Sequence, residues 1–498
     1  MADRRVVGLG LFWLVLVGLL CWRFRGAAPD DMFITYRYAQ NLVEGRGFLF
    51  NPPERVYGIS DPGVGLALAA GNAVTGLDIP VLGTVLTGFS LLVSGLVILS
   101  LGAKRGQFWE AAVGGTLALT SSYLWLGQGS GPLVALALLL LSSVLARHHP
   151  LGAGLLAGAG VWCRPESLIG CAILLWTMRG DRRRALLFGI AAGGLAIAGG
   201  LLGWRYFGQL APSTVAVKRQ FAALAPDKYT GWSGFWRPAI RHFVEYEGLA
   251  GALTLALGLA GVVPLVRRLG PVGWLLGLYC LAQVVLYSLL KIPFFIWYVA
   301  PPAFLVLIGL GFGLGAITRA AAGPTRPRWT AATVGILLFA GILIPAIVVR
   351  VRWAQGGPRD WRLHAYRAAG EWLKTHSPAL SDVAFDEVGM LAFYSERRVL
   401  DLIGLESPVT VPYAAVSDPV GGFLAAPTTY VLQHTFDLRG GTGPMVSRPW
   451  FAAAYQQVAR FDFLDLGGST ILYERRLGAE LPARRPPFDK RRKVPPPA

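Results

Sequence analysis

Residues 29–38 read PDDMFITYRY, and this run decides the fold because of what precedes it. The stretch from about Val6 to Phe24 is predominantly apolar and long enough to cross a bilayer. Two carboxylates, Asp30 and Asp31, therefore stand where a membrane helix leaves the lipid. Carboxylates at that depth are costly unless they are solvated, paired or used in function. The sequence predicts a membrane bundle organised around this acidic pair.

The composition of the 498-residue chain excludes an ordinary soluble domain. Hydrophobic residues make up 54% of it and charged residues 15%, whereas soluble domains carry about 25% charged residues. The net charge of +18 does not indicate nucleic-acid binding, because many of the basic residues lie in short links between apolar runs. That distribution is typical of the cytoplasmic loops of membrane proteins. We expect a polytopic protein that contacts the bilayer and binds no nucleic acid.

The apolar runs predict about eleven membrane spans, with the N-terminus inside and the C-terminus outside. The expected spans cover residues 6–24, 80–102, 107–126, 131–147, 150–163, 165–178, 185–207, 248–266, 271–290, 293–316 and 329–350. The short apolar segment 64–75 is expected to be re-entrant or to lie outside, because that choice places every basic loop inside. Residues 31–44 carry an apolar stripe at helical spacing, which predicts a short helix lying along the membrane surface.

Changes in composition divide the chain into three parts. Residues 1–350 are expected to form the transmembrane domain, with functional outer loops at about 26–62 and 208–247. Residues 351–480 mix polar and apolar residues and predict a soluble extracytoplasmic α/β domain, with a helix over 361–376 and strands over 383–385 and 398–403. Residues 481–498 are basic and proline-rich, which is typical of a disordered tail.

The acidic pair has two interpretations. A Pro-Asp-Asp run before an amphipathic segment is typical of a helix N-cap. One aspartate suffices for a cap, so the other is left for chemistry. Transfer of a sugar from a phosphate to a hydroxyl needs a base for the acceptor proton. It needs no strong acid, because phosphate already leaves well, whereas glycosidases use a second carboxyl as acid. We expect at least one of Asp30 and Asp31 to be that base.

A departing phosphate gains charge and must be held by cations. The candidates on the outer side are Arg37, Arg164, Lys218 and Lys291; for each, the alternative is an interfacial side chain that reaches out to water. Arg164 lies between two short apolar segments and beside Glu166, which also fits a structural ion pair. No Walker loop or dinucleotide fingerprint is present, and this favours a lipid-linked donor over a nucleotide sugar.

The first loop resembles that of GT-C glycosyltransferases. The likeness is carried by DDMFITYRYA at 30–39, NLVEGRG at 41–47, FNP at 50–52 and ERV at 54–56. Supporting matches are RPE at 164–166, YFG at 206–208, PST at 212–214 with Lys218, and DLIGL at 401–405. The likeness is greatest to the terminal arabinofuranosyltransferase branch of actinobacterial cell-wall synthesis. Protein O-mannosyltransferases and the aminoarabinose transferase that modifies lipid A are more distantly similar.

This resemblance implies an α-helical, polytopic GT-C fold, a polyprenyl-phosphate sugar donor and an aspartate base in the first outer loop. Asp30 is the first choice for the base, and Asp31 would then orient the acceptor or bind the donor. Displacement by the acceptor would invert the anomeric centre. The residues expected to bind the donor phosphate and sugar are Tyr36, Arg37, Arg164, Glu166 and Lys218. Those expected at the acceptor or in support of the loop are Glu54, Tyr57, Ser213 and Thr214.

The expected acceptor is a hydroxyl of an extracytoplasmic glycan, lipid or protein at a bacterial-type plasma membrane. Residues 57–63 depart from the family's aromatic, Ser/Thr-rich continuation, and Ser213 stands where Asn is usual, so arabinose is not carried over as the sugar. No ligand set for a metal is evident; because metal use varies within the wider fold, a divalent metal stays an open alternative. A transporter or flippase of lipid-linked glycans and a non-catalytic membrane scaffold are the other classes. Transporters usually show paired repeats and broken helices at the midplane.

Overall fold

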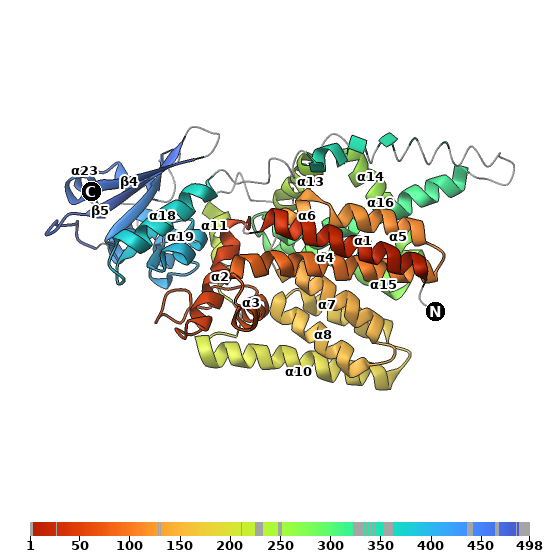
Figure 1. The fold of residues 1–498 in the computed structure, drawn as a ribbon. Coiled ribbons are helices and arrows are strands. Elements are labelled where there is room, and N and C mark those ends of the chain that lie inside the picture. The colour runs from red at the N-terminus through yellow and green to blue at the C-terminus, as the bar shows by residue number, and fades with distance from the viewer. Residues whose placement is uncertain are drawn as a thin grey trace.

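In this computed structural model the protein is an elongated helical bundle with a small α/β domain at one end (Figure 1). The structure describes residues 3–25, 27–127, 129, 131–210, 212–224, 233–247, 251–321, 362–435, 442–463, 468–484 and 486–487, with isolated positions between 333 and 351. Much of the expected span over 329–350 and most of the basic tail therefore lie outside the described residues.

The bundle consists of apolar helices of unequal length. They are α1 (Arg4–Phe24), α4 (Ile79–Lys104), α5 (Phe108–Leu119), α6 (Ser122–Leu126), α7 (Gly131–Leu145), α8 (Pro150–Cys163), α9 (Ser167–Thr177), α10 (Arg182–Phe207), α14 (Gly251–Leu269), α15 (Pro271–Leu290), the 3₁₀ turn η2 (Ile296–Val299) and α16 (Ala300–Ala321). Within the described part of the chain, six helical segments are long and apolar enough to cross a membrane: α1, α4, α10, α14, α15 and η2 with α16. A multi-pass helical fold is thus confirmed, while the total of eleven spans stays a prediction.

The expected span over 107–126 is not one helix. It divides into α5 and α6, and Ser121 at the break accepts a hydrogen bond from the backbone N–H of Leu124 at 3.4 Å. A serine that caps a new helix in this way ends the preceding one, because its side chain competes for backbone donors. Helices α7, α8 and α9 have 15, 14 and 11 residues, fewer than the roughly 20 that a full crossing needs.

Glycines bring α14 and α16 together backbone to backbone. A Cβ added at Gly261 would overlap the carbonyl oxygen of Gly309, and one added at Gly258 would overlap the carbonyl oxygen of Val306. A flexible side chain could move aside, but a helix backbone cannot do so locally. Small residues at such contacts are how membrane helices approach each other closely.

We expect Gly261→Ala to destabilise the bundle by about 1–3 kcal/mol, because the added methyl forces two helices apart in a packed interior. The matched control is Gly193→Ala on α10, where an added Cβ would meet nothing within 4 Å. Unfolding of the purified protein in detergent, followed by circular dichroism, measures both. Equal stability of the two variants would show that the α14–α16 contact is looser than described.

The C-terminal domain has a five-stranded sheet in the order β2 (Arg398–Asp401), β1 (Asp382–Phe385), β3 (Tyr430–His434), β5 (Ser469–Arg475) and β4 (Tyr455–Asp462). Strand β1 runs parallel to both its neighbours, while β3, β5 and β4 pair antiparallel. The helical elements are α18 (Leu363–His376), α19 (Val388–Ser395), η3 (Pro408–Thr410), α20 (Val411–Ala414), α21 (Pro419–Ala425), α22 (Gly443–Val446) and α23 (Pro449–Ala454). The helix expected over 361–376 and the strand expected over 383–385 are present, and the strand expected over 398–403 ends early, at Asp401.

The first loop lies between the bundle and this domain. Its helix α2 (Asp30–Val43) packs against α3 (Pro62–Thr75) and α4 on one side and against α19 on the other, as the placement of α2, α3 and α19 in Figure 1 illustrates. Ten of its fourteen residues are buried against the rest of the protein, and its position along the membrane surface stays a prediction. The second loop contributes α11 (Thr214–Leu224) and α13 (Ser233–Glu247).

Candidate functional site

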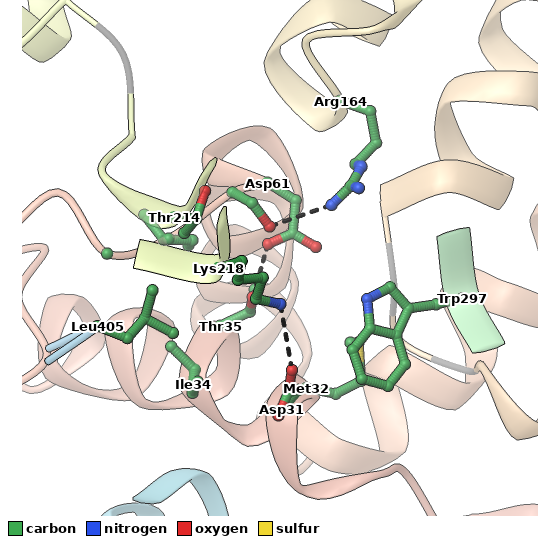
Figure 2. Close-up of a pocket in the computed structure, with 13 residues that line it drawn as sticks. Asp31, Met32, Ile34, Thr35, Asp61, Arg164, Thr214, Lys218, Trp297 and Leu405 are labelled. Atoms are coloured by element: carbon green, nitrogen blue, oxygen red, sulfur yellow. Dashed lines mark hydrogen bonds and ion pairs between the residues drawn. The ribbon is translucent and has the colours of Figure 1, made fainter. Parts of the chain in front are cut away.

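An open pocket of about 390 Å³ lies where the bundle, both loops and the C-terminal domain meet. Its lining comes from parts of the chain that are far apart in sequence. The lining residues are Asp31, Met32, Ile34, Thr35, Gly58, Ile59, Ser60, Asp61, Arg164, Thr214, Lys218, Trp297 and Leu405. Figure 2 shows two of its carboxylates and two of its cations pointing toward a shared space. Of the predicted site residues, the pocket brings together Asp31, Arg164, Thr214 and Lys218.

Asp31 and Lys218 face each other across this pocket (Figure 2). The Nζ of Lys218 lies 3.5 Å from Oδ2 of Asp31 and donates a hydrogen bond to the hydroxyl of Tyr298 at 3.0 Å. The side chain of Asp31 keeps 31% of its surface exposed, so a molecule in the pocket can reach it. Burial lowers the pKa of Lys218, but Tyr298 and Asp31 outweigh it, and the net pKa is raised. Lys218 is therefore a permanent cation at neutral pH.

Three aromatic rings support the Lys218 ammonium. Its Nζ lies 4.2 Å from the ring centroid of Phe295, 5.3 Å from that of Tyr298 and 5.8 Å from that of Trp297. Rings at such distances attract a cation through their negative faces. The rings of residues 295–298, which precede α16, therefore help to stabilise the largely buried ammonium of Lys218, whose ion pair with Asp31 is 3.5 Å long.

Arg164 is held in one orientation by three hydrogen bonds. Its Nε donates to Oε1 of Glu166 at 2.9 Å, its Nη1 to Oγ of Ser60 at 3.1 Å, and its Nη2 to the hydroxyl of Tyr287 at 3.0 Å. The guanidinium also lies 5.1 Å from the ring centroid of Tyr298. The turn therefore contains the structural ion pair that was one of its two interpretations. It also presents a fixed cation to the pocket.

Asp61 lines the pocket as well, and the sequence reasoning missed it. Its Oδ1 accepts a hydrogen bond from Oγ1 of Thr35 at 2.6 Å, and its Oδ2 accepts one from the N–H of Gly131 at 3.1 Å. It precedes α3 but its side chain makes no capping bond to that helix. Burial raises the pKa of Asp61, and the nearby Arg164 opposes that shift. The available signal was an acidic residue inside the stretch 57–63, which departs from the family pattern.

Asp30 is not among the lining residues, because its carboxylate caps α19. Its Oδ2 accepts a hydrogen bond from the N–H of Gly389 at 3.0 Å and its Oδ1 one from the N–H of Met390 at 2.7 Å. These are backbone donors of the first turn of α19, which have no partner inside that helix. Burial raises the pKa of Asp30, and the two backbone hydrogen bonds oppose the rise. Asp30 thus joins the first loop to the C-terminal domain.

We expect Asp30→Asn to destabilise the folded protein by about 1 kcal/mol, since an amide can accept only one of these two bonds and leaves a buried N–H unsatisfied. Thermal unfolding and limited proteolysis of the C-terminal domain measure the loss. An Asp30→Asn variant of unchanged stability that transfers no sugar would instead favour Asp30 as the base.

Two other predicted donor-binding residues of α2 lie outside the pocket. Arg37 is buried, and its Nη1 donates to Oε1 of Gln40 at 3.0 Å. Tyr36 is fully buried, and its ring packs edge-on against Phe33 and Phe393. Both side chains therefore belong to the packing around α2.

The residues expected at the acceptor or in support of the loop make bridging contacts. Oε1 of Glu54 accepts from Nε of Arg398 at 2.8 Å. The carbonyl of Tyr57 accepts from the N–H of Ser213 at 3.0 Å and from its hydroxyl at 3.3 Å, which joins the two loops. Thr214 lines the pocket. Within the described ranges, no group of three or more His, Cys, Asp or Glu residues could hold a metal.

Comparison with known proteins finds a matching family model and a relative that is similar in sequence. A family model described as a domain of unknown function (DUF8728) matches residues 357–479. The terminal β-(1→2)-arabinofuranosyltransferase of Mycobacterium tuberculosis is 30% identical over 235 residues, which are 41% of this chain and 36% of that protein. The matched stretch thus spans only about a third of that relative's length.

Two solved structures share the architecture. ArnT from Cupriavidus metallidurans, bound to undecaprenyl phosphate, matches with a TM-score of 0.56 at 14% identity, over 95% of this chain and 99% of that one. The Archaeoglobus fulgidus oligosaccharyltransferase, tethered with an acceptor peptide, matches with a TM-score of 0.54 at 12% identity, over 85% and 69% of the two chains. The resemblance drawn from the first loop is confirmed: this chain has the GT-C fold, and the relative that it matches in sequence is an arabinofuranosyltransferase.

Proposed function

We propose that this protein transfers a sugar from a polyprenyl-phosphate donor to a hydroxyl group of an acceptor. The observation that carries the proposal is a pocket in which an accessible carboxylate, Asp31, faces two cations, Arg164 and Lys218. A base and an anion-binding side are the two elements that this reaction requires. The undecaprenyl phosphate bound to ArnT supports a lipid-linked donor.

Asp31 is the proposed general base. The acceptor oxygen attacks the anomeric carbon while Asp31 takes its proton, and the bond from that carbon to the phosphate oxygen breaks with its electron pair going to the phosphate. Attack opposite the leaving group inverts the anomeric centre. Asp31 is preferred to Asp30 because it lines the pocket, whereas both oxygens of Asp30 are engaged by α19.

Arg164 and Lys218 are proposed to stabilise the charge that grows on the departing phosphate. Donors that are already oriented cost no reorganisation during the reaction, which makes them effective in a site shielded from water. The three hydrogen bonds of Arg164 and the aromatic rings around Lys218 provide such fixed orientation. Glu166 then acts by positioning Arg164, with which it pairs.

The acceptor is proposed to be a glycan, lipid or protein hydroxyl on the extracytoplasmic side of a bacterial-type plasma membrane. The basic links between apolar runs, such as residues 179–184, support this orientation because such links remain in the cytoplasm. Asp31 follows soon after the end of α1. The pocket would then lie at the depth of lipid headgroups, where a polyprenyl phosphate enters from the bilayer.

Purified protein in proteoliposomes, supplied with labelled polyprenyl-phosphate sugars and with nucleotide sugars, tests the proposal. We expect sugar to move only from a lipid-linked donor, with one free polyprenyl phosphate released for each sugar transferred. Movement of an intact lipid-linked glycan across the bilayer without release of polyprenyl phosphate would overturn it in favour of a transporter. A nucleotide sugar acting as the direct donor would equally overturn it.

A further inference from the structure

Glu406 of the C-terminal domain lies directly behind the wall of the pocket. Its side chain is fully buried, and its Oε2 lies 2.8 Å from the hydroxyl of Tyr38. A Cβ added at Gly58 would overlap the Glu406 carboxyl group, so only glycine fits there. Gly58 lines the pocket, and so does Leu405, the neighbour of Glu406. The reaction as proposed above gives Glu406 no role.

The hydrogen bonds of Tyr38 indicate which group carries the proton. Its hydroxyl lies 2.7 Å from the carbonyl oxygen of Val56, 3.2 Å from the N–H of Gly58 and 2.8 Å from Glu406. A phenol has one hydrogen to donate and two lone pairs. The carbonyl can only accept and the N–H can only donate, so Tyr38 gives its hydrogen to Val56 and receives one from Gly58. The remaining lone pair faces Glu406, which satisfies it only by donating.

The surroundings of Glu406 also disfavour a charged carboxylate. Its Oε1 is buried and has no hydrogen-bond partner among the described residues, which is costly for an anion. The neighbouring charged group is Asp401, whose Oδ1 accepts from the N–H of Ile403 at 2.8 Å and whose Oδ2 accepts from the N–H of Glu406 at 2.9 Å. Burial raises the pKa of Glu406 well above its usual value, and the nearby Asp401 adds to this rise.

We propose that Glu406 is a positioning residue that, as a neutral acid, fixes the pocket wall at residues 58–61. Its proton bridges to Tyr38 on α2, and Tyr38 in turn holds the backbone at Val56 and Gly58. The C-terminal domain thereby sets the position of Ser60 and Asp61, which face Arg164 and the substrate. The catalytic part of this inference rests on the proposed function.

Two variants test whether Glu406 acts as a neutral acid, as a charged carboxylate or only by filling space. Glu406→Gln keeps the shape and supplies an N–H donor for Tyr38, so we expect transfer within about twofold of the wild type and an unchanged KM for the lipid donor. Glu406→Ala removes the hydrogen bond to Tyr38 and so leaves the pocket wall at residues 58–61 less firmly held. We expect kcat/KM to fall at least about tenfold, mainly through KM. The proposal is overturned if the Gln variant is as defective as the Ala variant, or if the Ala variant equals the wild type.

A second measurement does not depend on sugar transfer, so it tests the protonation state of Glu406 even if the proposed function is wrong. When the folded-state pKa of Glu406 is above its unfolded-state pKa, the folded protein keeps the proton to a higher pH than the unfolded chain does. The contribution of Glu406 to the free energy of unfolding therefore falls as pH rises above about 4.5. Glutamine has no proton to lose. The Tm of Glu406→Gln minus that of the wild type should therefore become more positive from pH 5 to pH 8.

The matched control is Glu474→Gln. Glu474 also bonds a tyrosine, since its Oε1 accepts from the hydroxyl of Tyr430 at 2.8 Å, but this pair lies in the sheet away from the pocket. Because Glu474 only accepts in this pair, we expect no gain in Tm for Glu474→Gln over the wild type as pH rises. A flat difference for Glu406→Gln, or one that grows toward acid, would show that Glu406 is ionised in the folded protein.

Discussion

Replacing Asp31 by asparagine is expected to lower the rate of sugar transfer by a factor of about 10²–10⁴, the usual contribution of a positioned general base. The amide keeps the size of the side chain but cannot take a proton from the acceptor. It can still meet the ammonium of Lys218, from which Asp31 lies 3.5 Å away. The variant should therefore fold, bind the lipid donor with near-normal affinity and fail in the chemical step.

Single-turnover release of polyprenyl phosphate by purified Asp31→Asn measures this loss, with binding of the lipid followed separately. The comparison that decides the assignment is Asp30→Asn, the adjacent carboxylate. We expect that variant to lose stability and to keep most of its transfer rate at a temperature where it is folded. Normal rates in Asp31→Asn, or a loss confined to Asp30→Asn, would contradict the assignment of the base to Asp31.

In the structure Asp30 has a capping role, and the role of base is the one that we propose for Asp31. The sequence suggested a capping role, and Asp30 does cap a helix, but the helix is α19 and lies 359 residues further along the chain. Local spacing carries no information about such a partner, because the contact depends on how the C-terminal domain docks. The sequence alone therefore does not show that the carboxylate of Asp30 is engaged by α19.

Helical periodicity indicates which residues of α2 share a face with each aspartate. Asp31, Ile34 and Thr35 are spaced i, i+3, i+4 on α2 and line the pocket together. Phe33 lies on a different face and contacts the rings of Phe393 and Tyr394 of α19. The sequence could therefore predict that Asp30 and Asp31 face different surroundings. It could not predict which of the two faces meets the cavity.

The membrane helices and the C-terminal strand β1 were more predictable, since each depends on a local run of apolar or β-branched residues. The roles of Asp61, Trp297 and Glu406 were not, because each depends on contacts with elements that are distant in sequence. Their neighbours belong to other elements: α2 and α7 for Asp61, α11 for Trp297 and α2 for Glu406. Arg164 could be found because its charge stands out between two apolar segments, and Lys218 because it is a cation in the predicted outer loop; both also match the family resemblance.

Removing the charge of Lys218, by Lys218→Met, is expected to slow transfer about 10²–10³-fold, the typical effect of deleting one fixed donor to a developing negative charge. Lys218 is a cleaner test than Arg164, because removal of Arg164 would leave the buried Glu166 without its ion-pair partner and destabilise the fold. Asp31, the partner of Lys218, is partly exposed and tolerates the loss better.

Methionine fits the aromatic surroundings that Phe295 and Trp297 provide for the lysine chain, so the main change is one of charge. Binding should weaken more for free polyprenyl phosphate than for the sugar-linked donor, because the free phosphate carries more negative charge and Lys218 is proposed to act where that charge grows. Lys374→Met is the control, since Lys374 is exposed and pairs with Glu396 in the C-terminal domain. If Lys218→Met weakened both lipids equally and left the single-turnover rate intact, Lys218 would contribute to binding alone, and stabilisation of the departing phosphate would fall to Arg164.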